Sequence, residues 1–324
     1  MSIKLKAVSL FSGCGGFDWG AAAAGVNIIF ANDLNSHAAR AYRSLFPNVN
    51  FSEGDVRDIV QFPSADILIG CYPCTGFSVA ARRKWKTRKR RDLHSNENNF
   101  LYREFIRALR QVEPKFLFVE NVRGMTSASD GWFLERQIAN FQKLGYEVKP
   151  KVLNACDYGV AQTRKRLFIV GVRKDIKKFQ YEFLPPTHGP ETKKAFKTLD
   201  CIIGDMKRWP EGEYYEAPFH GHYLTRNRKR SWREPSYTIV ANANHVPLHP
   251  MGLPMRYLSK DKWEMRGVSN RRLSWRECAR LQGLPSIMKV PDSLYERYRI
   301  VGNAVPPRFG EILLMPIVRY SKEK

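Results

Sequence analysis

Short apolar runs alternate with longer amphipathic stretches over the first half of the chain. Strands are predicted where β-branched and aromatic residues cluster, and helices where apolar residues recur about every 3.6 positions. The predicted strands are 7–11, 28–32, 67–70, 116–120, 148–153 and 167–172, and the predicted helices include 19–24, 101–112 and 133–144. This alternation predicts an α/β fold with an open, mostly parallel, Rossmann-like sheet.

The pattern becomes irregular after residue 184, where prolines, glycines and aromatic residues are mixed with basic ones. Regular structure returns at 274–281, where Ser274 and Glu277 have the spacing of a capping box, and a final helix follows the Pro-Pro pair at 306–307. We therefore predict a catalytic domain at 1–184 and a smaller irregular domain at 185–268. The segment 269–324 is predicted to leave the edge of the irregular domain and return to the first one as a C-terminal helix.

The charge balance narrows the range of partners. The 324 residues include 54 lysines and arginines but only 31 aspartates and glutamates, a formal net charge of +23. An excess of this size, clustered in the sequence, favours a polyanionic partner, of which nucleic acid is the first candidate. No apolar run reaches the roughly 20 residues that span a bilayer, and no signal sequence is evident. We therefore expect a cytoplasmic protein whose six cysteines are reduced thiols.

A glycine-rich turn lies between the predicted strand 7–11 and the helix 19–24. Its glycines Gly13, Gly15 and Gly16 let backbone N–H groups approach a ligand closely. Asp33 follows the next strand, 20 residues after Gly13, where a carboxylate can accept ribose hydroxyls, and Asp55 follows a third segment. The third glycine comes too early for a dinucleotide fingerprint, so an adenosine ligand without phosphates fits better.

A candidate nucleophile, Cys74, follows the predicted strand 67–70 on a loop stiffened by Pro73. This places the thiol at the carboxyl edge of the sheet, where open α/β folds bind their ligands. A redox pair with Cys71, half of a zinc site and a buried structural pair are the alternatives. Zinc is disfavoured because no second cysteine pair or histidine cluster completes four ligands, so no metal is expected. The glycine-rich turn upstream disfavours the redox pair.

Two further features have the chemistry that a reaction at this edge needs. Glu120 leaves a buried strand, and desolvation there should raise its pKa toward that of a proton donor near neutral pH. Arg164 and Arg166 alternate along an extended segment, so both guanidinium groups could grip a carbonyl or a phosphate. The sequence thus supplies a thiol, an acid, two arginines and a ligand crevice.

In order along the chain, six blocks resemble those of the cytosine-C5 DNA methyltransferases, and in particular the bacterial type II modification enzymes. These blocks are 11–17, 73–74, 120–122, 162–166, 271–285 and 302–307. The resemblance implies that Cys74 adds to C6 of a flipped cytosine, that Glu120 contacts N3 and the exocyclic amine, and that Arg164 and Arg166 hold O2 and order the Cys74 loop. It also implies S-adenosylmethionine as the methyl donor and S-adenosylhomocysteine as the product. The residues that would line the cofactor site are Phe11, Gly13, Cys14, Gly16, Asp33, Leu34, Asp55, Val56, Pro73, Asn303 and Ala304.

Two positions depart from the family pattern. Thr75 stands where most members carry glutamine after the Pro-Cys pair, so a contact to DNA is expected to be missing or remade. Cys71 is also unusual at its position and could sensitise Cys74 to oxidation.

Double-stranded DNA is the expected partner. The basic segment 82–91 follows the Cys74 loop directly and would neutralise phosphates while the base is flipped, although such a run in isolation is more typical of a solvated segment. By the resemblance, the irregular domain at 185–268 would be the target-recognition domain. Within it, residues 223–250 are similar to part of the GGCC-specific members and would read guanine edges, with Asn244 where those members are expected to carry arginine. The predicted DNA-binding residues are Arg82, Arg83, Lys84, Lys86, Arg88, Lys89, Arg226, Arg228, Arg230 and Asn244.

The resemblance further implies a monomer within a restriction-modification system, paired with a cognate endonuclease. Other functions remain as alternatives at this stage. A tRNA-methylating branch shares the fold, cofactor and nucleophile, but its recognition region is usually shorter. A catalytically silent nucleic-acid-binding protein is disfavoured by the presence of Cys74, Glu120 and Arg164. A nicotinamide-dependent oxidoreductase is disfavoured by the glycine pattern and the charge.

Overall fold

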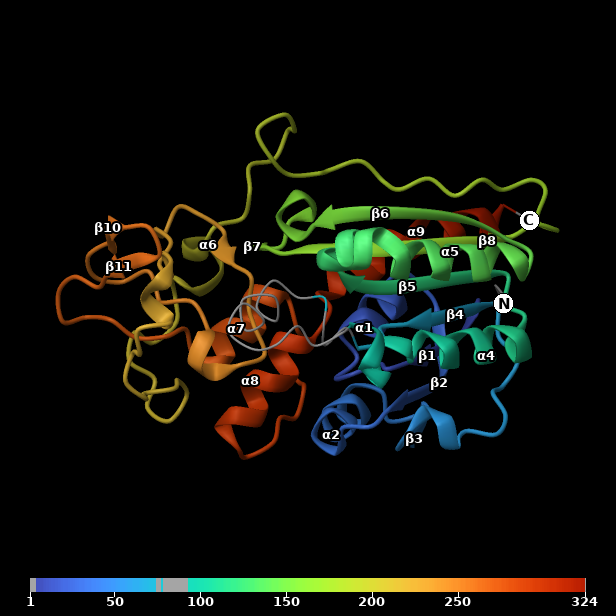
Figure 1. Ribbon diagram of the computed structural model, residues 1–324, viewed down its shortest axis with the longest axis horizontal. Coiled ribbons are helices and arrows are strands. Elements are labelled where there is room, and N and C mark those ends of the chain that lie inside the picture. The colour runs from blue at the N-terminus through green and yellow to red at the C-terminus, as the bar shows by residue number, and fades with distance from the viewer. Residues whose placement is uncertain (1–3, 74–76, 78–92, 324) are drawn as a thin grey trace.

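A computed structural model describes residues 4–73, 77 and 93–323 (Figure 1). Its seven-stranded sheet has the order β3-β2-β1-β4-β5-β8-β6. The strands are β1 (Lys6–Leu10), β2 (Asn27–Asp33), β3 (Asn50–Glu53), β4 (Ile67–Gly70), β5 (Phe116–Val122), β6 (Tyr146–Asn154) and β8 (Lys165–Arg173). The first five in this order are parallel, and β8 is antiparallel to both β5 and β6. The predicted open, mostly parallel sheet is confirmed.

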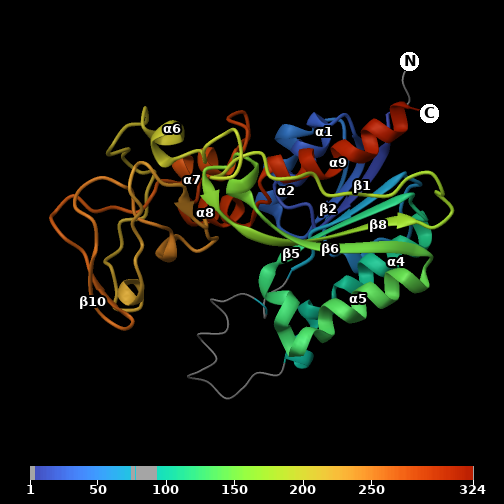
Figure 2. The same cartoon turned by 90° about the horizontal axis from the view of Figure 1, so that it is seen from above.

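Helices cover both faces of the sheet (Figure 2). On one face lie α1 (Gly16–Ala23) and α9 (Pro307–Lys322), and on the other α4 (Tyr102–Val112) and α5 (Trp132–Lys143). Side chains of a strand point alternately to the two faces, so Ile67 and Ile69 join the apolar core under α9 while Leu68 joins the core under α4 and α5. Because both faces are covered, the strands read as continuous apolar runs in the sequence.

The edge strand β3 and helix α8 are among the elements that the sequence prediction did not include. The edge strand β3 has one large apolar residue, Phe51, in four, so it lacks the apolar run that marks the central strands. Helix α8 (Leu294–Asn303) carries two tyrosines and two arginines and buries a narrow stripe that includes Tyr298 and Val301. The first strand also ends one residue earlier than predicted, because Phe11 adopts a left-handed backbone with φ +56°.

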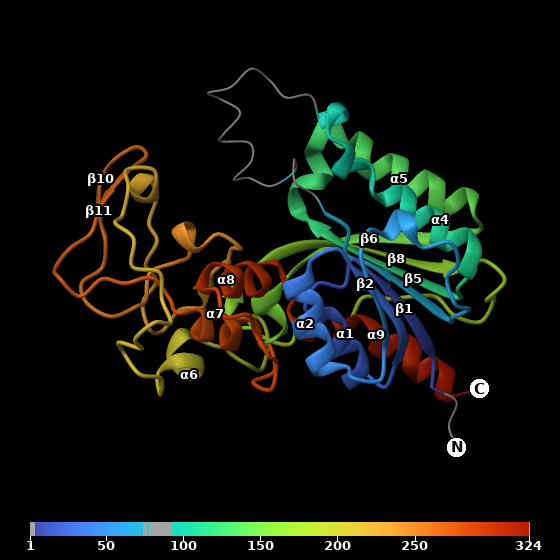
Figure 3. The same ribbon diagram turned by 90° about the horizontal axis from the view of Figure 1, so that it is seen from below.

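A second lobe with little regular structure lies beside the carboxyl end of the sheet (Figures 1 and 3). It contains α6 (Leu199–Ile203), the short strands β10 (Arg256–Ser259) and β11 (Lys262–Glu264), and α7 (Trp275–Gln282). Helices α7 and α8 pack through an apolar cluster against α2 (Ser36–Leu45) of the sheet lobe. A two-residue parallel ladder between β7 (Gln162–Thr163) and β9 (Ser236–Tyr237) gives a second connection.

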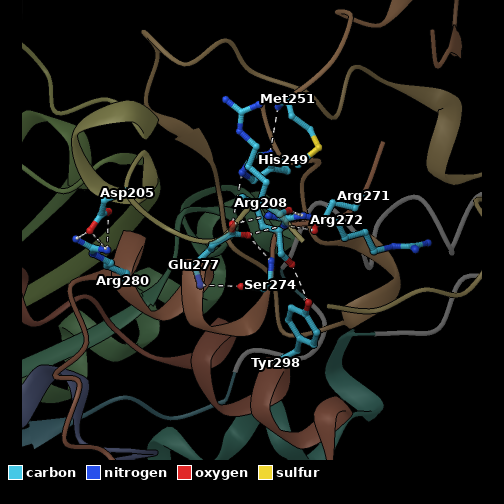
Figure 4. A network of polar contacts seen from close by, with 11 residues as sticks. Asp205, Arg208, His249, Met251, Arg271, Arg272, Ser274, Glu277, Arg280 and Tyr298 are labelled. Atoms are coloured by element: carbon cyan, nitrogen blue, oxygen red, sulfur yellow. Dashed lines mark hydrogen bonds and ion pairs between the residues drawn. The ribbon is translucent and has the colours of Figure 1, made fainter. Parts of the chain in front are cut away.

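The predicted capping box at the start of α7 is confirmed and belongs to a larger buried network (Figure 4). The Oγ atom of Ser274 accepts from the N–H of Glu277 at 3.1 Å, and the N–H of Ser274 donates to Oε2 of Glu277 at 2.6 Å. The same carboxylate holds the guanidinium of Arg271 through contacts of 2.8 and 2.7 Å. Both side chains of this ion pair are almost completely buried, at 1% and 0% exposure.

His249 completes this network. Its Nδ1 accepts from the N–H of Met251 at 3.1 Å, and its Nε2 lies 3.5 Å from Oε1 of Glu277. Burial, reinforced by the positive charge of Arg271, lowers the pKa of His249 to about 3. The ring is therefore neutral near pH 7, with its proton on Nε2, facing the carboxylate.

No helix in the described part of the chain is long and apolar enough to cross a membrane. The same residues contain no group of three or more histidine, cysteine, aspartate or glutamate side chains that could hold a metal ion.

Candidate active site and DNA interface

The glycine-rich turn connects β1 to α1, and two of its glycines adopt a left-handed backbone. Gly13 has φ +56° and Gly15 has φ +84°, and Gly15 serves as the N-cap of α1. A side chain on Gly16 would collide with the carbonyl oxygen of Val305, so the turn packs directly on the segment between α8 and α9. At Gly13, in contrast, a Cβ would meet open space. The turn thus needs glycine for two reasons, conformation at Gly13 and Gly15 and close packing at Gly16.

Asp33, at the end of β2, fixes the position of this turn. Its Oδ2 accepts from the N–H of Gly13 at 2.8 Å, and its Oδ1 accepts from the N–H of Asn35 at the same distance. Burial raises the pKa of Asp33, while these two hydrogen bonds and the charge of Arg299 oppose the rise. Arg299 is on α8, which the sequence pattern did not predict. Beside this carboxylate, the side chain of Leu34 is 71% exposed, an unusual state for a leucine and one that suits an apolar ligand surface.

The remaining predicted cofactor residues divide into two groups. Asp55 and Asn303 are accessible: Asp55 caps a short 3-10 helix, η1 (Val56–Asp58), and forms a 2.6 Å ion pair with Arg57 that lowers its pKa, and Asn303 is exposed at the end of α8. Val56 and Ala304 are buried beside them.

Cys14 has a packing role. Its Sγ lies 3.8 Å from the carbonyl oxygen of Ile300 on α8, and burial raises its pKa to about 12. Its thiol therefore joins the turn to α8, which differs from the ligand-facing position predicted for it.

Glu120 and Arg166 meet at the carboxyl edge of β5. The Nε of Arg166 lies 3.0 Å from Oε1 of Glu120, and the two side chains are only 15% and 12% exposed. Burial raises the pKa of Glu120, and the charges of Arg166 and Arg164 oppose that rise. The antiparallel pairing of β5 with β8, in which Val122 is opposite Arg166, brings the two residues together. The predicted acid and one of the two predicted arginines therefore form a single site.

Arg164 has different surroundings. It is 2% exposed, and its guanidinium donates to the carbonyl oxygens of Ile239 at 2.9 Å and Gly302 at 3.2 Å. These acceptors belong to the irregular lobe and to the end of α8. The two arginines, predicted to act together, are thus divided: Arg166 contacts Glu120, and Arg164 joins two distant backbone segments behind it.

Two glutamines that the sequence pattern did not single out complete this junction. Gln162 accepts from the N–H of Ile239 at 2.8 Å and donates to Oε1 of Gln282 at 3.1 Å. Gln282 in turn donates to the carbonyl oxygen of Val301. Both lie within blocks that carried the family resemblance, and that position was the available signal. The junction fixes where the irregular lobe lies relative to Glu120.

The predicted nucleophile Cys74 and the predicted basic residues Arg82, Arg83, Lys84, Lys86, Arg88 and Lys89 lie outside the described residues. The chain leading to Cys74 is placed up to Pro73. Tyr72 is buried, its hydroxyl donates to Oε1 of Gln137, and its carbonyl oxygen accepts from Nδ2 of Asn121 at 3.4 Å. Because Asn121 follows Glu120, the loop that carries Cys74 starts directly beside the acid.

The predicted base-reading arginines also have different environments. Arg226 is exposed, whereas Arg228 is 5% exposed and donates to the carbonyl oxygens of Tyr223 at 3.0 Å and His245 at 3.2 Å. The prediction that Arg228 reads a guanine edge is therefore wrong, because its donors stabilise the interior of the lobe. Arg230 forms a 2.5 Å ion pair with Glu234. Asn244 is half-buried, and its backbone N–H donates to Asn242 at 2.9 Å.

The chain resembles known proteins over nearly its whole length. The model of the C-5 cytosine-specific DNA methylase family matches residues 5–319. The type II methyltransferase M.BsuRI of Bacillus subtilis is 39% identical over 360 residues, covering 98% of this chain and 80% of that protein. M.BspRI of Lysinibacillus sphaericus is 36% identical over 364 residues, covering 99% and 83%. The crystal structure of S. pombe Dnmt2 methyltransferase has a TM-score of 0.66 at 16% identity, covering 97% of this chain and 99% of that one, which is a likeness of fold.

Proposed function

The chain belongs to the C-5 cytosine-specific DNA methylases, which transfer a methyl group from S-adenosylmethionine to C5 of cytosine in DNA, and we propose how its residues divide that work. The observation that carries the proposal is the buried pair of Glu120 and Arg166, 3.0 Å apart, beside the start of the loop that carries Cys74. An acid with a raised pKa and a guanidinium at one sheet edge match the two polar sides of a cytosine ring.

The residues at the neighbouring strand ends fit S-adenosylmethionine. The open space at Gly13 leaves room for a ligand against the turn, Asp33 and Asp55 offer carboxylates to hydroxyl and amino groups, and exposed Leu34 offers an apolar surface to an adenine ring. Phe11, Gly16, Val56, Pro73, Asn303 and Ala304 would complete the walls. When bound, this cofactor supplies an electrophilic methyl group on a sulfonium.

Cys74 acts first on the flipped base, because its thiolate forms a bond to C6 of cytosine. Glu120, protonated, donates to N3 and keeps the ring electron-poor, and Arg166 donates to O2. C5 thereby becomes nucleophilic and would take the methyl group, with the electron pair of the broken S–CH3 bond remaining on the sulfur of the product S-adenosylhomocysteine. Loss of the C5 proton to a base and cleavage of the Sγ–C6 bond then restore the ring and the thiolate. Arg164 positions this site by holding the recognition lobe against α8.

The target site is proposed from the recognition lobe. The basic segment 82–91 neutralises phosphates around the flipped base, while Arg226, which is exposed, reads base edges together with Arg230 and Asn244. The similarity of residues 223–250 to GGCC-specific enzymes makes GGCC the first sequence to test. Relatives named as type II methyltransferases support a role in restriction-modification. A cognate endonuclease as partner and a cytoplasmic, monomeric enzyme belong to the same proposal.

Bisulfite sequencing of DNA from a host that expresses the protein tests this proposal. We expect 5-methylcytosine in one short sequence, GGCC, and none in a matched host that expresses Cys74→Ser. Digestion with a methylation-sensitive endonuclease that cuts GGCC gives an independent reading. Complete cutting in cells with active enzyme would reject GGCC, and the bisulfite pattern would then identify the true site.

A further inference from the structure

A basic groove lies on the outer face of the sheet lobe, away from the site described above. It has a volume of about 330 Å³ and runs between α4 and α5, which lie side by side. Figure 3 shows both helices on the same side of the sheet. Three arginines line it, Arg103 and Arg110 from α4 and Arg136 from α5, together with Trp132, whose side chain is 37% exposed. All three arginines are exposed.

The positive charge of this groove is not balanced by carboxylates of its own. No aspartate or glutamate is among its lining residues. Glu104 on α4 is engaged by Arg107 at 2.7 Å, and Glu135 on α5 lies near Gly131. Within the described ranges, Arg103, Arg110 and Arg136 form no ion pair, and Arg103 has its Cζ 4.5 Å from the ring centre of Phe100. Three like charges on one concave surface favour an anionic occupant.

Charge also limits what the occupant can be. The basic segment 82–91 of this chain would be repelled, and a second copy carries the same net charge of +23. A polyanion is favoured, and the established substrate of this family is a polyanion.

One end of the groove lies close to the residues that follow the basic segment 82–91 in the chain. Trp132 and Tyr102 are the first residues of α5 and α4, and the ring of His94 lies 4.8 Å from Trp132. His94 belongs to η2 (Leu93–Ser95), which follows the basic segment directly in the chain. We propose that this groove binds the phosphate backbone of duplex DNA outside the target site. Arg103 and Arg110 are seven residues apart on α4. Their separation of about 10 Å along the helix axis lets the two guanidinium groups contact different phosphates of one strand.

Removing the groove charges tests the proposal on two lengths of DNA. The variant Arg103→Gln/Arg110→Gln/Arg136→Gln is compared with the wild type on two duplexes of about 12 and about 40 base pairs, each with one target site. The measured quantity is the slope of log affinity against log salt concentration. We expect the slope on the long duplex to flatten by about 2 to 3, at about 0.9 per lost phosphate contact, and the slope on the short duplex to stay unchanged. The difference in affinity between the long and the short duplex should therefore be smaller for the variant than for the wild type.

A matched control removes equal charge from a surface outside the groove. Lys174, Lys177 and Lys178 are exposed, follow the end of β8 and are not among the residues that line the groove. Their triple substitution by glutamine should not alter the dependence on duplex length. Neutralising Lys86, Arg88 and Lys89 should flatten the slope on both lengths, because those residues are expected to act at the target base itself.

Thermal unfolding and S-adenosylmethionine binding report whether the groove variant is folded. Ethylation interference, which identifies the phosphates that the protein contacts, gives a second measurement. With the wild type we expect contacted phosphates beyond one side of the target site, and with the variant we expect these outer contacts to be lost. Equal slopes for variant and wild type on both lengths, or an equal loss on both, would overturn the proposal.

Discussion

The two lobes of this enzyme are stabilised in different ways. The sheet lobe has apolar strands between two helical layers, with continuous cores on both faces. Apart from α7 and α8, the recognition lobe has little regular structure, and its own separate core contains only three buried apolar residues, Tyr223, Leu248 and Met255. Its interior instead holds buried cations: Arg228, Lys229, Arg271 and Arg272 are each less than about 7% exposed.

Each of these cations is satisfied by oxygen atoms of the irregular chain. Lys229 donates to the carbonyl oxygens of Met251 and Leu253 and to Asn270, at 2.6 to 2.9 Å. Arg272 donates to the carbonyl oxygens of Tyr215 and Ala217 at 3.0 and 2.7 Å. A loop-rich lobe has many backbone carbonyls that form no hydrogen bond within a helix or sheet. Buried lysine and arginine side chains donate hydrogen bonds to them. Buried arginines in this lobe therefore serve stability, and their low exposure separates them from Arg226, for which we propose a role in reading bases.

The largest expected effect is in the sheet lobe and concerns chemistry alone. Cys74→Ser should reduce methyl transfer by more than the 10²–10⁴-fold typical of losing one acid or base, because a hydroxyl is a far weaker nucleophile than a thiolate near neutral pH. Binding of DNA and of S-adenosylmethionine should persist. Single-turnover transfer of a labelled methyl group measures the loss, and turnover above about a hundredth of wild type would contradict the covalent mechanism.

Glu120→Gln should lower kcat by about 10²–10⁴-fold. Burial raises the pKa of Glu120, so its donating form persists above the pH at which an exposed glutamate ionises. The wild-type rate should fall as pH rises through that pKa, and this limb should vanish in the glutamine variant. Glu182→Gln is a matched control, since that carboxylate is 73% exposed and forms only a surface pair with Lys149. An unaltered pH profile in Glu120→Gln would assign the proton to another group.

The sheet and most of the site could be predicted from the sequence for a physical reason. Buried parallel strands require apolar runs, and β4 was predicted with its observed bounds, Ile67–Gly70. The ends of neighbouring strands meet at one edge, so residues that follow them, such as Asp33 and Glu120, could be grouped from their places in the sequence alone. Arg228 and Arg164 could not be assigned in this way. Their carbonyl acceptors come from irregular segments and from the end of α8, up to 138 residues away, and no local pattern encodes that.

The buried ion pair in the recognition lobe should be the most sensitive point for its stability. Glu277→Gln leaves the positive charge of Arg271 buried without a negative charge beside it. We expect the free energy of unfolding to fall by about 3–5 kcal/mol. Glu264→Gln is the matched control, since its ion pair with Arg256 is exposed and should be worth about 0–1 kcal/mol. Urea unfolding followed by tryptophan fluorescence compares them. If the two variants lost equal stability, buried cations would not explain how this lobe is held together.

The smallest expected effect concerns Arg226, the exposed member of the arginines predicted to read bases. Its forked donors suit the O6 and N7 atoms of guanine, so Arg226→Ala should cost roughly 1–3 kcal/mol in discrimination between a GGCC duplex and one with a substituted guanine. Ratios of kcat/KM for the two duplexes measure this directly. Arg256→Ala, an exposed arginine on β10 of the same lobe, serves as the control and should leave the ratio unchanged. A base contact lowers the rate on the cognate site more than on the substituted one, whereas a phosphate contact lowers both equally. An equal loss on both duplexes would therefore make Arg226 a backbone contact and leave base reading to Arg230 and Asn244.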